Sequence, residues 1–113
     1  MTLDELIFEL SARFKDEEVQ KLCQHLKDWK NSDDDIAALE DMAERYLGSV
    51  WVEDEKTHNQ VYALCSEFRD CEIRSIGGKT MNERLYSFSL LEKFDQAQNE
   101  TMKHKLYVKL MAT

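Results

Sequence analysis

The scarcity of residues that interrupt a helix is the feature that most constrains this chain. Its 113 residues include no proline and only three glycines, at positions 48, 77 and 78. Proline removes a backbone donor and clashes with the preceding turn, and glycine adds backbone freedom, so their near absence favours long helices. The glycines then mark the places where helices are expected to end.

Apolar residues recur at steps of three and four along most of the chain, which predicts amphipathic helices. Thr2 and Glu5 have the spacing of a capping box, and a first helix is expected over residues 2–14. A second helix is expected to begin near Asp16 and to carry its apolar stripe as far as Trp29. For Trp29, which completes that stripe, a place in the core is favoured over an exposed one.

A third helix is predicted after the acidic run 33–35, which offers side chains for an N-cap and negative charge for the positive end of the helix dipole. Gly48 follows the last apolar residue of this helix and is expected to form a left-handed C-cap. Between residues 80 and 98 the capping-box spacing of Thr80 and Glu83 predicts another helix, and Asn99 is expected to cap a last one.

Two segments have alternative interpretations. Residues 50–52 could form a short strand paired with residues 71–76, or could belong to a helix that begins at Ser49 and ends near Arg69. The helix is favoured because a two-stranded sheet alone is marginal. The expectation is an all-α fold, a compact bundle of five to six helices in one domain over residues 1–113, with one short two-stranded element near 50–52 and 71–76 as the alternative.

Charge is unevenly distributed in this chain of formal net charge −8. Residues 1–56 hold 16 acidic and 7 basic side chains, a net of −9, whereas residues 57–113 hold 7 acidic and 8 basic ones, a net of +1. Such a surface repels a phosphate backbone, so direct nucleic-acid binding is disfavoured, and it attracts a basic protein. That the charge only keeps the protein in solution is an equal alternative.

Most motifs of catalysis and metal binding are missing. Cys23, Cys65 and Cys71 are odd in number and have no recurring spacing, which favours reduced, buried thiols over a disulfide. The three histidines lie apart in sequence and outside any metal-ligand motif. We therefore expect no enzymatic activity, no metal and no cofactor.

The turn Gly78-Lys79-Thr80 has the ending of a phosphate-binding loop, but that pattern needs a glycine where Ile73 stands. A turn that initiates a helix is the favoured interpretation. The chain also has no run approaching the roughly 20 apolar residues of a membrane span and no basic, apolar leader at its start, so no membrane association and a cytoplasmic location are expected.

Acidic residues beside tryptophans suggest a surface for recognising a basic partner. An exposed tryptophan surrounded by carboxylates has the composition of a binding hot spot, since the ring supplies contact area and the charges steer association. For Trp51 a place in the core is an equal alternative. The residues predicted to bind the partner are Asp33, Asp34, Asp35, Asp41, Glu44, Trp51, Glu53, Asp54 and Glu55.

The segment Gly77-Gly78-Lys79-Thr80-Met81-Asn82-Glu83-Arg84-Leu85-Tyr86, followed by Leu90-Leu91-Glu92-Lys93-Phe94-Asp95, resembles the C-terminal part of many short, uncharacterised bacterial proteins. In those proteins a Gly-Gly-x-Thr-x-Asn-Glu-Arg-Leu stretch precedes a helix that contains Glu-x-Phe-Asp. The match covers about a third of the chain. It implies a bacterial origin and a helical end, and it transfers no activity. Asn82, Glu83 and Arg84 are its polar signature.

These observations lead to three functional hypotheses. The first is a non-enzymatic acidic protein that binds a basic protein partner, most concretely an immunity protein that neutralises a nuclease-type toxin. The second is a structural or adaptor subunit that self-associates through an apolar helix face. The third is a small hydrolase or nucleotide-handling enzyme that uses the turn at 77–84.

Overall fold

The computed structural model describes residues 1–49 and 54–112. Those residues form seven α-helices, one π-helical turn and one 3-10 turn, within an envelope of 46 × 25 × 21 Å. No strand occurs among them, so the all-helical class is confirmed. The helices are α1 (Leu3–Arg13), α2 (Glu17–Asn31), α3 (Ile36–Ser49), α4 (Glu55–Phe68), α5 (Met81–Ser87), α6 (Leu91–Asp95) and α7 (Glu100–Lys109).

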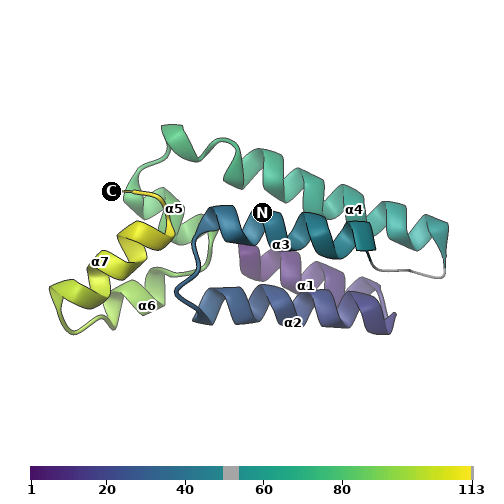
Figure 1. Cartoon of the computed structure of the whole chain (residues 1–113), viewed down its shortest axis with the longest axis horizontal. Coiled ribbons are helices and arrows are strands. Elements are labelled where there is room, and N and C mark those ends of the chain that lie inside the picture. Colours follow the sequence, from purple (N-terminus) through teal and green to yellow (C-terminus); the bar gives the residue numbers. More distant parts are fainter. Residues whose placement is uncertain (50–53, 113) are drawn as a thin grey trace.

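The first four helices lie along the long axis of the molecule, and the three short ones gather at one end (Figure 1). α3 and α4 run in opposite directions, so the start of α3 and the start of α4 lie at opposite ends of this pair (Figure 1). No helix in the described part of the chain is long and apolar enough to cross a membrane.

One hydrophobic core joins all the long helices and the C-terminal end. Its buried apolar residues include the stripes expected for α1 and α2, and Trp29 is buried as predicted. The largest fully buried side chains are Phe88, Leu3, Leu6, Leu10, Leu22, Ile36, Leu39, Leu85, Leu90, Leu110, Val19 and Val61.

Helix starts follow the capping residues identified in the sequence. Thr2 and Glu5 form the predicted capping box at α1, and Thr80 and Glu83 form another at α5. The side chain of Asn99 accepts a hydrogen bond of 2.9 Å from the Met102 amide at the start of α7. These contacts satisfy amides that a helix N-terminus leaves without partners.

The predicted left-handed C-cap at Gly48 is wrong. Gly48 lies inside α3, and none of the described glycines has a positive φ. The last carbonyls of α3 have other partners: the Ser49 hydroxyl donates to Tyr46 O at 3.4 Å, and Nε2 of His58 lies 3.1 Å from Leu47 O. The helix therefore needs no glycine turn to satisfy them.

The alternative strand at 71–76 is also wrong. α4 continues into a π-helical turn, Arg69–Ile73, and then into the 3-10 turn Ile76–Gly78. Residues 50–52, its expected partner, lie outside the described residues. The expected helix from Ser49 starts too early, because the backbone of Asp54 is extended and caps a helix that begins at Glu55.

The single helix predicted over 80–98 is broken into α5 and α6. Ser89 has a φ of 57°, in the left-handed region, and its hydroxyl accepts a hydrogen bond of 3.0 Å from the Asp4 amide. This bend allows Phe88 and Leu90, which are both 0% exposed, to enter the core together. Burial of two large apolar side chains outweighs the cost of one strained residue, and the described chain therefore has more helices than the five or six expected.

Candidate functional site

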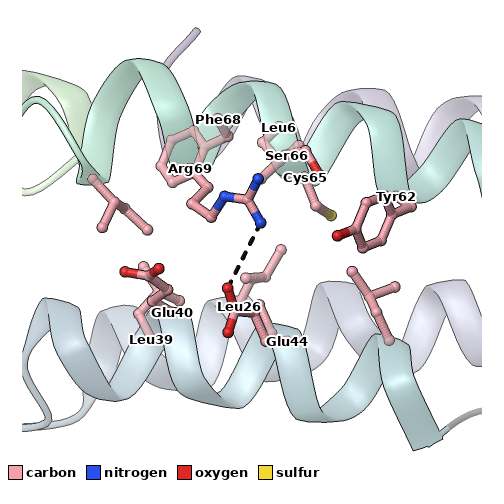
Figure 2. Close-up of a pocket in the computed structure, with 13 residues that line it drawn as sticks. Leu6, Leu26, Leu39, Glu40, Glu44, Tyr62, Cys65, Ser66, Phe68 and Arg69 are labelled. Atoms are coloured by element: carbon pink, nitrogen blue, oxygen red, sulfur yellow. Dashed lines mark ion pairs between the residues drawn. The ribbon is translucent and has the colours of Figure 1, made fainter.

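A groove with an apolar floor separates α3 from α4 (Figure 2). α1 and α2 lie beneath it and contribute Leu6 and Leu26 to its floor. It is narrow, with a cavity volume of about 40 Å³. The residues that line it are Leu6, Leu26, Leu39, Glu40, Ala43, Glu44, Leu47, Tyr62, Cys65, Ser66, Phe68, Arg69 and Ile73.

Helical spacing gives the α3 wall two kinds of side chain. Leu39, Ala43 and Leu47 recur every four residues and face the floor, and the two on either end of that set are buried. Glu40 and Glu44 are offset from them by one residue and form the rim. The α3 wall is therefore apolar below and carboxylate above.

An ion pair crosses the mouth of the groove. Nη1 of Arg69, at the start of the π-helical turn, lies 3.6 Å from Oε1 of Glu44 on α3 (Figure 2). The Arg69 side chain is 20% exposed and that of Glu44 is 52% exposed. We refer to this Arg69–Glu44 contact as the latch. A solvated contact at this distance closes the mouth only weakly, since surface ion pairs contribute little.

The π-helical turn sets the position of this arginine and of a second one. Its wider ring is closed by the Arg74 amide, which donates to Arg69 O at 2.9 Å. Nη2 of Arg74 lies 3.8 Å from Oε1 of Glu40. Both rim carboxylates of α3 therefore face an arginine that follows α4.

Arg69 has neighbours on its own side of the groove. Its Nε donates to Oδ1 of Asp70 at 3.1 Å. Hydrogen bonds to Asp70 and to Tyr62 raise the pKa of Arg69 above its ordinary value. The guanidinium is charged at every physiological pH, and Asp70 gives it a second acidic partner besides Glu44.

Cys65 lies in the groove but is not an activated nucleophile. Burial raises the pKa of its thiol to about 12, and the neighbouring Cys23 acts in the same direction. Burial also raises the pKa of Cys23. A thiol of this kind is protonated at neutral pH and unreactive. All three cysteines are free; Cys23 is buried as expected, Cys65 partly so, and Cys71 is exposed, contrary to the expectation of burial.

The predicted partner-binding residues on α3 lie on different sides of that helix. Glu44 lines the groove and forms the latch. Asp41 is exposed outside the groove and pairs along the helix with Arg45, whose Nε lies 3.1 Å from its Oδ2. Of these two residues, only Glu44 lies at the rim of the groove.

Asp33, Asp34 and Asp35 form the turn between α2 and α3, where they have structural partners. Oδ1 of Asp35 accepts from the Ala38 amide at 2.9 Å and so caps α3. The Asp35 carbonyl accepts from Nε1 of Trp29 at 2.8 Å. Oδ2 of Asp33 lies 3.9 Å from Nζ of Lys105, on α7. Basic residues from the second half of the chain thus approach this acidic turn.

Lys109 of α7 is the most buried of these basic residues, with 2% of its surface exposed. Its Nζ donates to the carbonyls of Trp29, Ser32 and Asp34 at 2.6, 2.7 and 2.8 Å, and it lies 3.9 Å from the centre of the Trp29 ring. We refer to these contacts as the clasp. Burial, followed by the nearby charge of Lys93, lowers the pKa of Lys109 to about 8, against the opposing effect of the three aspartates. It is charged at neutral pH and donates to three carbonyls between the end of α2 and the start of α3, of which that of Trp29 also accepts from the Ser32 amide and hydroxyl.

Asp54 and Glu55 lie at the start of α4, at the opposite end of the α3–α4 pair from the acidic turn (Figure 1). Asp54 caps α4, and its hydrogen bonds from the Thr57 hydroxyl and the Lys56 amide lower its pKa. Trp51 and Glu53 lie outside the described residues. Since α3 has 14 residues, the two acidic ends are separated by roughly 20 Å along its axis.

Lys79, the cation of the glycine turn before α5, is already paired. Nζ of Lys79 is engaged by Glu72 and by Ser87, whose hydroxyl lies 3.2 Å away. Burial opposes ionisation of Glu72, yet the contacts with Lys79 and Ser87 hold its pKa below the ordinary value. Within residues 1–49 and 54–112 no group of three His, Cys, Asp or Glu side chains is placed to hold a metal ion.

Comparison with models of protein families, with curated proteins and with solved structures gave no match. The functional interpretation therefore depends on the geometry of the groove.

Sequence reasoning missed the α4 wall of that groove and the rim residue Glu40. The four-residue step from Glu40 to Glu44 was a usable signal for a shared helix face, as was the seven-residue step from Tyr62 to Arg69. Neither step indicates which helix lies opposite. The pairing across the groove is a tertiary property.

Proposed function

We propose that this chain is a non-enzymatic acidic protein that acts by binding a basic protein partner, most concretely an immunity protein that neutralises a nuclease-type toxin by covering its active site. The observation that supports this most is the groove between α3 and α4, where an apolar floor lies below the carboxylates of Glu40 and Glu44. An apolar pocket with a charged rim is the arrangement of an interface hot spot.

The sign of the charge favours a basic partner. The first half of the chain, which contains α3, has a net charge of −9 from 16 acidic and 7 basic residues up to position 56. Nucleases carry cationic clefts for phosphate, and an acidic surface associates with such a cleft at an accelerated rate. Burial raises the pKa of the Cys65 thiol to about 12, so this groove residue is protonated at neutral pH, which argues against thiol catalysis and is consistent with a binding role.

The test is neutralisation of the product of the gene immediately before the coding sequence. That product is expressed alone and together with this chain, and growth and nuclease activity are measured. We expect toxicity that this chain relieves, inhibition at a one-to-one ratio, and an association rate that falls steeply with added salt. A metabolic enzyme at that position, or toxicity that this chain does not relieve, would contradict the proposal.

The second candidate is a structural or adaptor subunit that self-associates through an apolar helix face. The observation in its favour is Phe8 of α1, an aromatic side chain that is 67% exposed. Sedimentation at low and high salt separates the two candidates. Self-association that does not respond to salt and is lost in Phe8→Ser would favour the adaptor, whereas a monomer at both salt concentrations favours acidic recognition.

A further inference from the structure

We infer that the groove between α3 and α4 is a docking site for a basic amphipathic helix of the partner, in which a partner arginine or lysine replaces Arg69 at Glu44. An apolar side chain of the same helix then enters the groove over Leu47 and Cys65. This inference rests on the proposed function, and it adds the chemistry of the segment that binds and its position.

The latch can open because both of its members have somewhere to go. The Nη1–Oε1 distance is 3.6 Å, longer than a hydrogen bond, and the Glu44 side chain is half-exposed. When Arg69 leaves Glu44, its Nε still donates to Oδ1 of Asp70 at 3.1 Å. Glu44 is then free to accept a cation from outside, with no charge left unpaired on Arg69.

The two rim carboxylates of α3 have the spacing of two basic residues on one face of a partner helix. Glu40 and Glu44 are four residues apart on one face, which places them about 6 Å apart along the helix axis. Two basic residues four apart on a partner helix have the same spacing. Arg74 and Arg69 pair with these two carboxylates at 3.8 and 3.6 Å, and each also pairs with Asp70, at 3.6 and 3.1 Å, so both can give way to the basic residues of a partner.

The apolar floor of the groove indicates which apolar residues the partner helix carries. Leu39, Leu47 and Phe68 are buried apolar side chains beneath the mouth. A helix that lies in a groove is recognised through apolar anchors three or four residues apart. The occupant is therefore a helix that carries a basic pair at positions i and i+4 and a large apolar residue beside that pair.

A second copy of this chain does not fit the description. In its sequence Lys105 and Lys109 are the one pair of Lys or Arg residues that stand four apart. Lys109 is buried in the clasp and cannot reach a neighbouring molecule. The charge pattern of the rim thus selects a different protein.

The test is selection of peptides from a displayed library of random helical peptides on the whole chain. Peptides that are enriched are synthesised, and their dissociation constants are measured by fluorescence anisotropy. We expect them to contain a Lys or Arg pair four residues apart beside Leu, Ile or Phe. Enrichment of peptides without a basic pair, or no enrichment, overturns the inference.

Three variants then locate the site. Glu44→Gln is expected to weaken binding of the selected peptides by about tenfold, because the carboxylate that receives the cation is lost. Arg69→Gln is expected to strengthen binding by about threefold, because it removes an internal competitor for Glu44. Asp41→Asn, a matched loss of charge outside the groove, should stay within about twofold.

Weaker binding by Arg69→Gln would overturn the inference, since it would show that Arg69 contacts the peptide and does not compete with it for Glu44. Circular dichroism and urea midpoints confirm that the variants fold. The two proposals fail separately. If Glu44→Gln and Arg69→Gln neutralise a toxin equally well, only the docking site is contradicted. If the peptides follow the predicted order of affinities but the neighbouring gene encodes no toxin, only the immunity function is contradicted.

Discussion

The clasp and the latch each depend on one cation that joins segments distant in sequence. The surroundings of these two cations, Lys109 and Arg69, differ. Lys109 is 2% exposed, and its Nζ has three carbonyl acceptors at 2.6 to 2.8 Å. The Arg69 side chain is 20% exposed, and its acceptor across the groove is a half-exposed carboxylate at 3.6 Å. A buried cation whose donors are all satisfied is a permanent connection, whereas a solvated ion pair opens at little cost.

This difference separates a firmly held end of the molecule, around α7, from the more weakly connected α3–α4 side. The clasp fastens α7 to the end of α2, and Arg84 fastens the chain after α7 to the start of α5. The α3–α4 side has the weaker connection, directly above an apolar floor. Local opening needs the least free energy where exposed contacts join two elements, so it is expected at the mouth of the groove before the clasp.

The largest effect is expected at the clasp. Lys109→Met keeps the aliphatic stem but leaves the carbonyls of Trp29, Ser32 and Asp34 without this donor. We expect the free energy of unfolding to fall by about 3–5 kcal/mol, measured in urea. Lys105→Met, on the same helix and 61% exposed at its side chain, is the control and should stay within about 0.5 kcal/mol. A loss below about 1 kcal/mol for Lys109→Met would show that the clasp is not a structural connection.

A smaller effect is expected at Arg84. Its Nη1 donates to Leu110 O at 2.9 Å and to Met111 O at 2.7 Å, and its Nε donates to Lys79 O at 3.1 Å. Arg84→Met should cost about 1–3 kcal/mol of unfolding free energy, because these carbonyls lose a charged donor. Asn82, two residues earlier, is exposed and serves as the control. The described part of the structure gives its side chain no role in the fold. Equal effects for Arg84→Met and Asn82→Ala would contradict this role.

The pKa of Lys109 distinguishes the clasp from the latch, because lysine loses its charge within an accessible pH range and arginine does not. The folded pKa of Lys109 is about 8 and its ordinary value is 10.5. Between those values the unfolded chain binds more protons, so this group makes the free energy of unfolding rise with pH, by up to about 1.4 kcal/mol per unit. The check is the NMR titration of the Lys109 side-chain Cε signal, with an expected midpoint near pH 8. A midpoint above 10.5 would show that the clasp favours the charged lysine more strongly than burial opposes it.

The smallest effect on stability is expected at the latch. Arg69→Gln removes a partly exposed ion pair and leaves no buried group unsatisfied. The urea-derived free energy of unfolding should stay within the 10–15% or so by which such extrapolations vary. A loss as large as that of Lys109→Met would mean that Arg69 holds the fold together and cannot be released for a partner.

The sequence predicted best what is determined locally. The capping boxes at Thr2 and Thr80 and the cap at Asn99 were found from spacing alone, because each contact spans three residues. The break between α5 and α6 was missed. It depends on Phe88 and Leu90 entering the core on either side of a left-handed Ser89, and that choice is made by packing.

In the candidate site, too, contacts between segments distant in sequence could not be predicted. Glu44 was identified from the excess of acidic residues, but its partner Arg69 was not, since the pairing depends on how α4 lies against α3. The acidic turn at Asp33 to Asp35 was expected to face a partner. The structure places Lys105 and Lys109 of α7 against it, and such pairing between distant segments cannot be read from composition.

The most direct test of an openable groove is the alkylation rate of Cys65, which lies in the groove beside the latch. The rate is measured with N-ethylmaleimide by mass spectrometry in a Cys71→Ser background, since Cys71 is exposed and would react first. If the latch controls the groove, Arg69→Gln raises the rate at Cys65 about threefold or more, with the urea midpoint unchanged and buried Cys23 unreactive. An unchanged rate at Cys65, or equal gains at Cys65 and Cys23, would contradict local opening and leave global unfolding as the only route to this thiol.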